Sequence, residues 1–346
     1  MIDRRTALKS VIAATLVSAA GAPTAALGRE RIIKPARLER GQTIGLVTPA
    51  SNTLENEDIE MGADIVRSLG FRVKKAENIY ARTNYLAGSD EGRARDLNAM
   101  FADDDVDAIF CVRGGYGTTR ILPYLDYELI RANPKVLMGY SDITGLLNAI
   151  FVKTGLVGFH GPNASQNFTD YALGEYEKVL VEPGARTVIG QAPPFEAGRG
   201  RIDKKNRLTR ITRGTARGRL IGGNLTLLTS INGTPYEPDY SDSILFLEDV
   251  SEAPYRVDRM LTELWLSGHL DRVKGIAIGK FTDFESDGNQ FSMEEIFRMR
   301  FEPLGVPTLR GLMIGHIEDQ TTVPVGIEAE LDVDAGTLTL LEPAVS

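Results

Sequence analysis

The sequence is poor in several residue types that particular classes of protein need. Its 346 residues include a single cysteine, Cys111, so no disulfide can form within the chain. Basic residues are the minority, 39 against 47 acidic ones, and the net charge of −8 argues against nucleic-acid binding as a main role. With 42% hydrophobic and 25% charged residues the composition is that of a globular protein, and the length predicts about two domains.

Histidine is scarce as well, since His160, His269 and His316 are the only three in the sequence. Together with one cysteine they form no pair at zinc-ligand spacing, so we predict no metal site. No dinucleotide-binding or P-loop motif is present, and we predict no cofactor. Cys111 lies inside an apolar run, which favours a place in the core over a role as nucleophile.

Residues 1–28 have the pattern of an export signal. Arg4 and Arg5 precede an Ala-rich apolar stretch at 11–20; small residues follow, and Ala26-Leu27-Gly28 offers a cleavage site. The paired arginines favour the twin-arginine route, with a Sec-type signal as the alternative. The apolar stretch of about 10 residues is too short for a membrane span, which takes about 20. We therefore expect an exported, periplasmic protein without a stable membrane span.

Apolar runs alternate with segments of helical spacing through residues 38–165. The predicted strands are 43–48, 71–74, 108–112, 136–140 and 156–159, and the predicted helices are 55–69, 90–101, 118–125 and 143–152. Ser89 is a predicted N-cap for the second of these helices. Strands that are apolar on both faces and alternate with helices predict a parallel sheet with helices on both sides.

Regular patterning weakens after this region, where Pro, Gly and Arg accumulate. We interpret 166–217 as a linker that leads into a second domain at 218–346. The predicted elements of that domain are strands at 244–247, 275–278 and 309–313, helices at 256–266 and 293–300, and a hairpin over 329–341. The second domain is therefore expected to be β-rich and mixed.

The end of the predicted strand 136–140 has the pattern of a nucleophile elbow. The strand runs into Gly139, one spacer residue, Ser141 and then directly into a helix, which would expose the serine hydroxyl above the sheet. The same turn would direct the backbone N–H of Asp142 to the same place. The pattern departs from G-x-S-x-G because Ile143 replaces the last glycine. In the alternative interpretation Ser141 or Asp142 only caps the helix.

A glycine-rich turn, 113–117, follows another strand of the same predicted sheet. It could supply N–H groups to an oxyanion or a phosphate, or it could be a tight turn that needs glycine dihedral angles. Its spacing matches no phosphate-binding motif, so phosphate is the weaker interpretation.

A serine nucleophile needs a base and a group that orients the base. His160 follows a strand of the first sheet and His316 lies in an acidic loop of the second domain, and spacing leaves the two comparable. His269 lies at a predicted helix end, where it suits the helix dipole better. Glu248 or Asp249, at the end of an apolar strand, could orient the base, or could be a solvated strand end and a helix cap.

The order of these motifs resembles that of the LD-carboxypeptidases, also called muramoyltetrapeptide carboxypeptidases, which are related to the microcin-immunity serine peptidases. The matching stretches are VRGGYG at 112–117, GYSDIT at 139–144, GGNL at 222–225, LEDVSEAPYRVDR at 247–259, Gly315-His316 and Pro324-Val325-Gly326. The resemblance implies an α/β protein with a flavodoxin-like parallel sheet in its N-terminal domain and a β-rich mixed C-terminal domain.

Carried over by motif, the resemblance implies that Ser141 is the nucleophile, Glu248 the orienting carboxylate and His316 the base. It implies that Gly115 and Asp142 supply the N–H groups of an oxyanion hole. The implied substrate is a peptidoglycan-derived stem tetrapeptide, cut between the L-centre of its third residue and the terminal D-Ala.

Two other functions compete with this one: a microcin-type immunity peptidase that cleaves acyl-nucleotide conjugates, and a periplasmic binding protein without catalysis. Arg113 is a candidate for binding the terminal carboxylate of a peptide, with a structural salt bridge as its alternative role. The partners we expect are a peptide substrate and no nucleic acid, with a homodimer as the candidate assembly.

Overall fold

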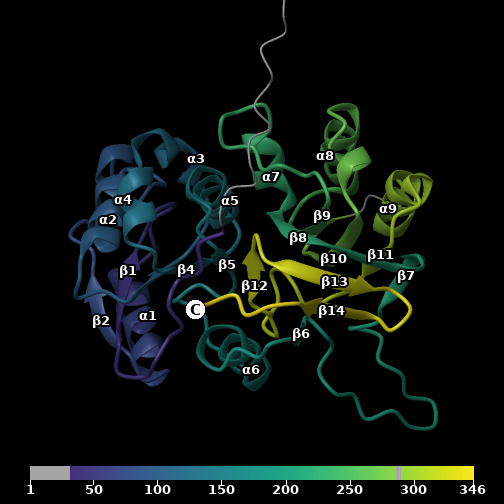
Figure 1. Ribbon diagram of the computed structural model, residues 1–346, viewed down its shortest axis with the longest axis horizontal. Helices are drawn as coiled ribbons and strands as arrows, with labels where there is room; N and C mark the ends of the chain where they lie inside the picture. Colours follow the sequence, from purple (N-terminus) through teal and green to yellow (C-terminus); the bar gives the residue numbers. More distant parts are fainter. Residues whose placement is uncertain (1–31, 286–287, 289) are drawn as a thin grey trace, which may run out of the picture. The chain divides into compact units, whose positions relative to one another are not determined.

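A computed structural model describes residues 32–285, 288 and 290–346, and these residues form two β-sheets (Figure 1). The predicted export signal, residues 1–28, lies outside the described residues. None of the helices in the described ranges is long and apolar enough to cross a membrane.

The first sheet has the strand order β12-β5-β4-β3-β1-β2. Strands β1 to β5 are parallel, and β12 joins them antiparallel to β5. The order 2-1-3-4-5 within it is that of flavodoxin-like sheets, so this part of the predicted fold class is confirmed. The strands are β1 (Thr43–Val47), β2 (Arg72–Lys75), β3 (Ala108–Cys111), β4 (Val136–Gly139), β5 (Gly158–His160) and β12 (Val323–Val325).

Four of the five helices between these strands were predicted from the sequence pattern, whereas the one at Tyr127–Ala132 was not. They are α1 (Asn56–Ser68), α2 (Asp90–Ala102), α3 (Thr118–Ile121), α4 (Tyr127–Ala132) and α5 (Ile143–Thr154). Ser89 caps α2 by accepting a hydrogen bond from the Gly92 N–H, as predicted. The predicted helix 118–125 is shorter than expected, because Pro123 cannot donate the next helical hydrogen bond and a single 3₁₀ turn follows Ile121.

The second sheet has the order β6-β14-β13-β8-β9-β10-β11-β7. Its four consecutive strands β8 to β11 are parallel, and the strands that flank them are antiparallel, so the β-rich mixed domain is confirmed. The strands are β6 (Thr187–Ile189), β7 (Thr209–Thr212), β8 (Thr215–Asn224), β9 (Ser243–Val250), β10 (Gly275–Thr282), β11 (Thr308–Arg310), β13 (Glu328–Asp332) and β14 (Thr337–Leu340). The predicted hairpin is β13–β14.

The sequence pattern did not predict several elements between the sheets. Segment 166–217 contains α6 (Asp170–Tyr176) and the strands β6 and β7, which close the two edges of the second sheet. Strands β6 and β7 are short, partly exposed edge strands with little apolar alternation, so the sequence pattern did not predict them. Strand β8 was not predicted because glycines interrupt its apolar pattern. Gly222 is needed there, since a Cβ on it would lie 2.0 Å from the Phe246 carbonyl oxygen. The predicted domain boundaries stay a prediction.

The carboxyl ends of the two sets of parallel strands meet. The Asn224 N–H at the end of β8 donates to Thr144 Oγ1, in the first turn of α5, over 3.0 Å. A Cβ on Gly223 would lie 2.6 Å from the Thr144 side chain, so only glycine permits this approach. In open α/β sheets ligands bind at strand carboxyl ends, so the meeting point is where a site is expected. The remaining helices are α7 (Leu225–Ile231), α8 (Pro254–Leu266) and α9 (Met293–Phe301).

Candidate active site

Ser141 occupies a strained turn between β4 and α5. Its φ of +65° is in the left-handed region, which costs a residue other than glycine about 1–3 kcal/mol. The turn is held by hydrogen bonds from the Thr144 N–H to the Ser141 carbonyl oxygen at 2.9 Å and from the Ile143 N–H to the Tyr140 carbonyl oxygen at 3.3 Å. A strained serine between a buried strand and a helix has the geometry of a nucleophile elbow.

Gly139 makes this turn possible by its lack of a side chain. A Cβ at Gly139 would lie 2.9 Å from Asn163 Oδ1, 3.0 Å from Ile143 Cγ1 and 3.1 Å from Cys111 Cβ.

Cys111 is fully buried, and burial raises the pKa of its thiol far above the usual value. A buried thiol with a raised pKa is a packing group and an unreactive one.

The glycine-rich turn 113–117 is fastened to the elbow by Asp142. The Asp142 carboxylate accepts a hydrogen bond from the Thr118 N–H at 2.8 Å, and Thr118 Oγ1 donates back to the Asp142 carbonyl oxygen at 2.5 Å. A Cβ on Gly114 would lie 2.9 Å from Ser141 Cβ, whereas one on Gly115 would lie 2.5 Å from Ser51 Oγ. The turn therefore lies directly against the serine.

Within the described residues, the N–H groups of Gly115 and Asp142 donate to no other protein group. Donors left unpaired beside a nucleophile are what an oxyanion hole requires. The assignment of these two groups to an oxyanion hole stays a prediction.

Buried Arg93 also holds this turn, a role that the sequence analysis did not predict. Arg93 Nη1 donates to the Gly117 carbonyl oxygen at 2.8 Å and to that of Pro49 at 2.5 Å. Its second nitrogen pairs with Asp90. These bonds tie together the loops that follow β1 and β3.

Glu248 and His316 form a pair on the second sheet. His316 Nδ1 lies 2.7 Å from Glu248 Oε2, and the carboxylate, at the end of β9, is fully buried. This bond assigns the proton to Nδ1 and leaves Nε2 as the acceptor, the tautomer of a general base. Gly315, with φ +118°, allows the approach, because a Cβ there would lie 2.8 Å from Glu248 Oε2. The imidazole packs on Tyr140, with ring centroids 4.7 Å apart.

Asp249, the other carboxylate at this strand end, has a structural position. It accepts hydrogen bonds from Asn224 Nδ2 at 2.8 Å and from the N–H and Oγ1 of Thr226 at 3.0 and 2.9 Å. Burial, helped by the neighbouring Glu248, raises its pKa to about 6. Asp249 therefore stabilises the start of α7, and of these two neighbouring carboxylates Glu248 is the one that contacts a histidine.

The other two histidines lie elsewhere. His160 is fully buried behind Glu248, with its Nε2 4.0 Å from Glu248 Oε1, and burial lowers its pKa to about 4. Neither of its ring nitrogens has a hydrogen-bond partner within the described residues. His269 stacks on Tyr240 and lies 3.4 Å from Glu237, away from Ser141.

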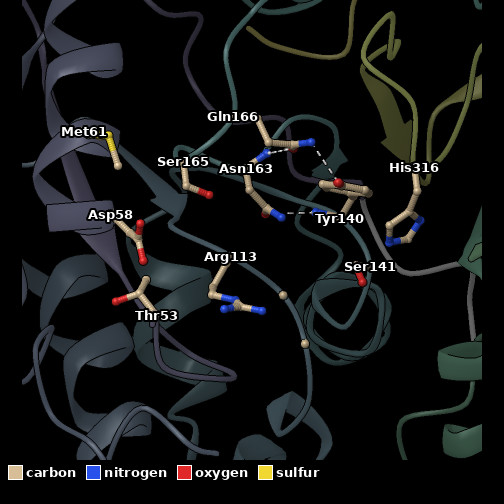
Figure 2. Close-up of a pocket in the computed structure, with 12 residues that line it drawn as sticks. Thr53, Asp58, Met61, Arg113, Tyr140, Ser141, Asn163, Ser165, Gln166 and His316 are labelled. Carbon is tan, nitrogen blue, oxygen red and sulfur yellow. Dashed lines mark hydrogen bonds between the residues drawn. The ribbon is translucent and has the colours of Figure 1, made fainter. Parts of the chain in front are cut away.

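Ser141 and His316 line one pocket of about 460 Å³ (Figure 2). No hydrogen bond joins their side chains in the described part of the chain, which is common for catalytic groups without bound substrate. The other lining residues are Thr53, Asp58, Met61, Arg113, Gly114, Gly115, Tyr140, Asn163, Ser165 and Gln166.

Arg113 and Asp58 are the charged side chains of this pocket. Arg113 Nη1 donates to the Asn52 carbonyl oxygen at 3.1 Å and has no ion-pair partner among the described residues. Asp58 and Met61, on α1, lie at the far end of the pocket from His316 (Figure 2). The sequence analysis did not predict this part of the pocket; the signal for it was that α1 follows the carboxyl end of β1.

No group of three or more His, Cys, Asp or Glu side chains in the described ranges is arranged to hold a metal ion. The chemistry that the geometry offers is nucleophilic: an elbow serine, a base and a buried orienting carboxylate.

Comparisons with known proteins found matches along most of the chain. Residues 44–161 match the LD-carboxypeptidase N-terminal domain and residues 217–331 match the LD-carboxypeptidase C-terminal domain. The probable murein peptide carboxypeptidase of Bacillus subtilis is 38% identical over 315 residues, which cover 90% of this chain and 95% of that protein.

Two solved structures are similar over nearly the same length. The muramoyltetrapeptide carboxypeptidase from Oxalobacter formigenes has a TM-score of 0.72 at 30% identity and covers 86% of this chain and 98% of its own. The structure of MccF in complex with glutamyl sulfamoyl guanosine has a TM-score of 0.83 at 27% identity, with coverage of 90% and 99%. MccF is the microcin C7 self-immunity protein of Escherichia coli.

Proposed function

The chain belongs to the LD-carboxypeptidase family and is a peptide hydrolase, and on that premise we propose that it is a serine carboxypeptidase acting on peptidoglycan stem tetrapeptides. It cuts the L,D bond between the third residue, a diamino acid, and the terminal D-Ala. The observation that carries this proposal is one pocket lined by a strained Ser141 and by His316, which a buried Glu248 orients. The names of the relatives from Bacillus and Oxalobacter support the substrate class.

In the acylation step His316 Nε2 takes the proton of Ser141 Oγ as the oxygen attacks the scissile carbonyl. The imidazolium that forms is stabilised by the Glu248 carboxylate at 2.7 Å. The backbone N–H groups of Asp142 and Gly115 bind the oxyanion, each contributing about 3 kcal/mol to stabilising the transition state.

His316 then gives its proton to the nitrogen of D-Ala, the C–N bond breaks, and Ser141 is left as an acyl ester. Water, deprotonated by the same histidine, attacks the ester and restores the serine hydroxyl. The product is a tripeptide.

Specificity for a chain end requires a cation for the terminal carboxylate, and the position of Arg113 in the wall of the pocket supports this role. Since Arg113 has no ion-pair partner in the described part of the chain, its guanidinium is open to a substrate carboxylate. Asp58, at the other end, is suited to the side-chain ammonium group of a diamino acid.

We also propose that the enzyme is exported through the twin-arginine route, which Arg4 and Arg5 ahead of an apolar stretch support. This would place it in the compartment that holds peptidoglycan.

The test is D-Ala release from a purified stem tetrapeptide by the purified protein, beside its Ser141→Ala variant. Release by the wild type that disappears in the variant is the expected result. A folded wild type that releases no D-Ala would overturn the proposal.

A second candidate is the cleavage of acyl-nucleotide conjugates, which the similarity to MccF supports. Hydrolysis of an aminoacyl sulfamoyl nucleoside by the wild type, without D-Ala release from the tetrapeptide, would favour it. Loss of both activities in Ser141→Ala would show that they share one nucleophile. A non-catalytic binding protein is the third alternative, and turnover of either substrate would exclude it.

A further inference from the structure

A second pocket, of about 380 Å³, lies at the carboxyl ends of β10 and β11, where segment 204–209 covers it. It contains none of Ser141, Glu248 and His316. The lining residues that carry charge are Lys204, Lys205, Arg207, Lys280, Arg310, Glu318 and Asp319.

The five basic side chains of this pocket are not neutralised by the protein. Within the described residues, none of the five forms an ion pair. Two other arginines of this domain differ: Arg213, in the turn between β7 and β8, pairs with Asp334, and Arg217, on β8, pairs with Glu330. In a chain of net charge −8, unpaired cations gathered around one cavity are a local feature that calls for an anion.

The acidic side chains nearest to the pocket are engaged elsewhere or exposed. Asp319 Oδ1 accepts a hydrogen bond from Thr169, and Glu318 is exposed. Asp203 accepts from the N–H groups of Lys205 and Asn206 in its own loop, both at 2.9 Å. None of these carboxylates forms an ion pair with the basic side chains in the described part of the chain.

Lys280 and Arg310 are built into the floor of the pocket. Lys280 Nζ donates to the Lys205 carbonyl oxygen and to Asn206 Oδ1, both at 3.3 Å, which leaves its remaining N–H bond open. The Arg310 guanidinium lies over the Phe297 ring at 5.2 Å. Burial lowers the pKa of both groups. Partly desolvated cations without a carboxylate partner are unfavourable until an anion joins them.

We propose that this pocket is a binding site for phosphoryl groups, of the inorganic pyrophosphate or nucleoside diphosphate class. A single carboxylate needs one cation, whereas five cations around a cavity of this size match a ligand with several negative charges. Proteins bind phosphate mostly through arginine, which offers a planar set of donors, and lysine, which offers a compact charge. Arg310 and Lys280 supply one of each.

The site adjoins the loop that carries the base of the active site. Ile317, Glu318 and Asp319 line it and directly follow His316, and Thr282 Oγ1 donates to the His316 carbonyl oxygen at 3.4 Å. A bound phosphoryl group therefore contacts the His316 loop. This link rests on the proposed function, and it gives the ligand two sources: a free phosphate compound, or the diphosphate of a nucleotide-linked stem peptide.

The first measurement is calorimetric titration of the full chain with inorganic pyrophosphate, which needs no turnover. We expect binding that weakens with added salt and that is about 10-fold weaker in Lys280→Ala and in Lys205→Ala. Arg213→Ala, an exposed arginine already paired with Asp334, is the matched control and should bind as the wild type does. Absence of binding, or equal affinity in the wild type and both lysine variants, would overturn the proposal.

The second measurement identifies the source of the phosphoryl group. If it belongs to the substrate, KM for D-Ala release is lower with a nucleotide-linked tetrapeptide than with the free tetrapeptide, and Lys280→Ala removes the difference. Equal KM values with pyrophosphate binding intact assign the site to a free phosphate compound. Failure of the proposed carboxypeptidase function would leave the titration unaffected, so the two failures are distinguishable.

Discussion

The carboxyl ends of β4 and β9 each present one reactive side chain, and they hold it in opposite ways. Ser141 is positioned by its backbone: a left-handed φ of +65° on a tight turn, with no hydrogen bond from its hydroxyl within the described residues. His316 is positioned by a side-chain hydrogen bond to Glu248, a carboxylate that is fully buried. The nucleophile depends on local geometry and the base on burial.

This difference determines which substitutions are tolerated around Ser141 and which around His316. A turn of strained backbone accepts a changed side chain, because the strain belongs to the main chain and is sustained by the packing around Gly139 and Gly114. A buried charge tolerates few changes in its surroundings, because a buried carboxylate that loses its partner keeps the full free-energy cost of desolvation. Substitutions at Ser141 should therefore remove activity and spare the fold, whereas those around Glu248 should affect both.

The largest expected effect is that of Ser141→Ala. Removal of the nucleophile should lower kcat for D-Ala release by at least about 10⁴-fold, while the melting temperature stays within a few degrees of the wild type. Ser165→Ala, which removes another serine from the same pocket, is the control and should keep kcat within about 10-fold. A Ser141→Ala protein with comparable activity would break the assignment of the elbow.

The next effect is that of Glu248→Gln. An amide in place of the carboxylate favours the wrong tautomer of His316, so kcat should fall by about 10³-fold or more, together with a lower melting temperature. The matched change is Asp249→Asn, in a buried carboxylate that contacts α7 and not the histidine. It should lower the melting temperature with much less effect on kcat. Equal kcat losses in the two variants would contradict the distinction between these carboxylates.

A smaller loss is expected from Gly315→Ala. The added Cβ would lie 2.8 Å from Glu248 Oε2 and would displace the carboxylate or the histidine loop, which should lower kcat by about 10²-fold. Gly268→Ala is the control, because Gly268 also has a positive φ, of +73°, but nothing within 4 Å of its Cβ position. It isolates the cost of backbone strain. If both variants lose activity equally, the approach of Gly315 to Glu248 does not position the base.

The smallest effect on activity is expected from His160→Gln, which instead tests burial through pH. Burial lowers the His160 pKa from its usual 6.5 to about 4, so between these pH values the unfolded chain binds a proton that the folded chain does not. The contribution of neutral His160 to the free energy of unfolding, about 3 kcal/mol, is fully present above pH 6.5 and is lost as the pH falls toward 4.

Denaturant unfolding of the wild type and of His160→Gln at pH 7 and pH 4.5 measures this contribution as a difference between the two proteins. The free energy of unfolding of the wild type should fall more steeply toward acid pH. His269→Gln, at a buried histidine where the nearby Glu237 opposes the lowering of the pKa by burial, should flatten the profile less. Parallel profiles for the wild type and His160→Gln would mean that His160 stays exposed to protons in the folded state.

Most strands and helices of the N-terminal half could be predicted from the sequence, because the pattern that specifies each of them lies within a few neighbouring residues. Apolar runs of strand length alternate with helical spacing, and Ser89 supplies the cap of α2 where the pattern places it. The elbow belongs to the same class, since Gly139 and Ser141 are two residues apart at the end of a buried strand.

What the sequence by itself determined was thus the sheet of the first half, the elbow and the set of candidate histidines and carboxylates. Spacing left His160 and His316 open, and the motif resemblance implied His316 with Glu248. Only the tertiary structure showed the 2.7 Å contact between the two, the hydrogen bonds of Asp249 to α7, and the pairing of β6 and β7 with the edges of the second sheet. Periodicity reports which face of an element is buried. It carries no information on which distant residues share a cavity, because long-range strand pairing and the meeting of strand ends decide that.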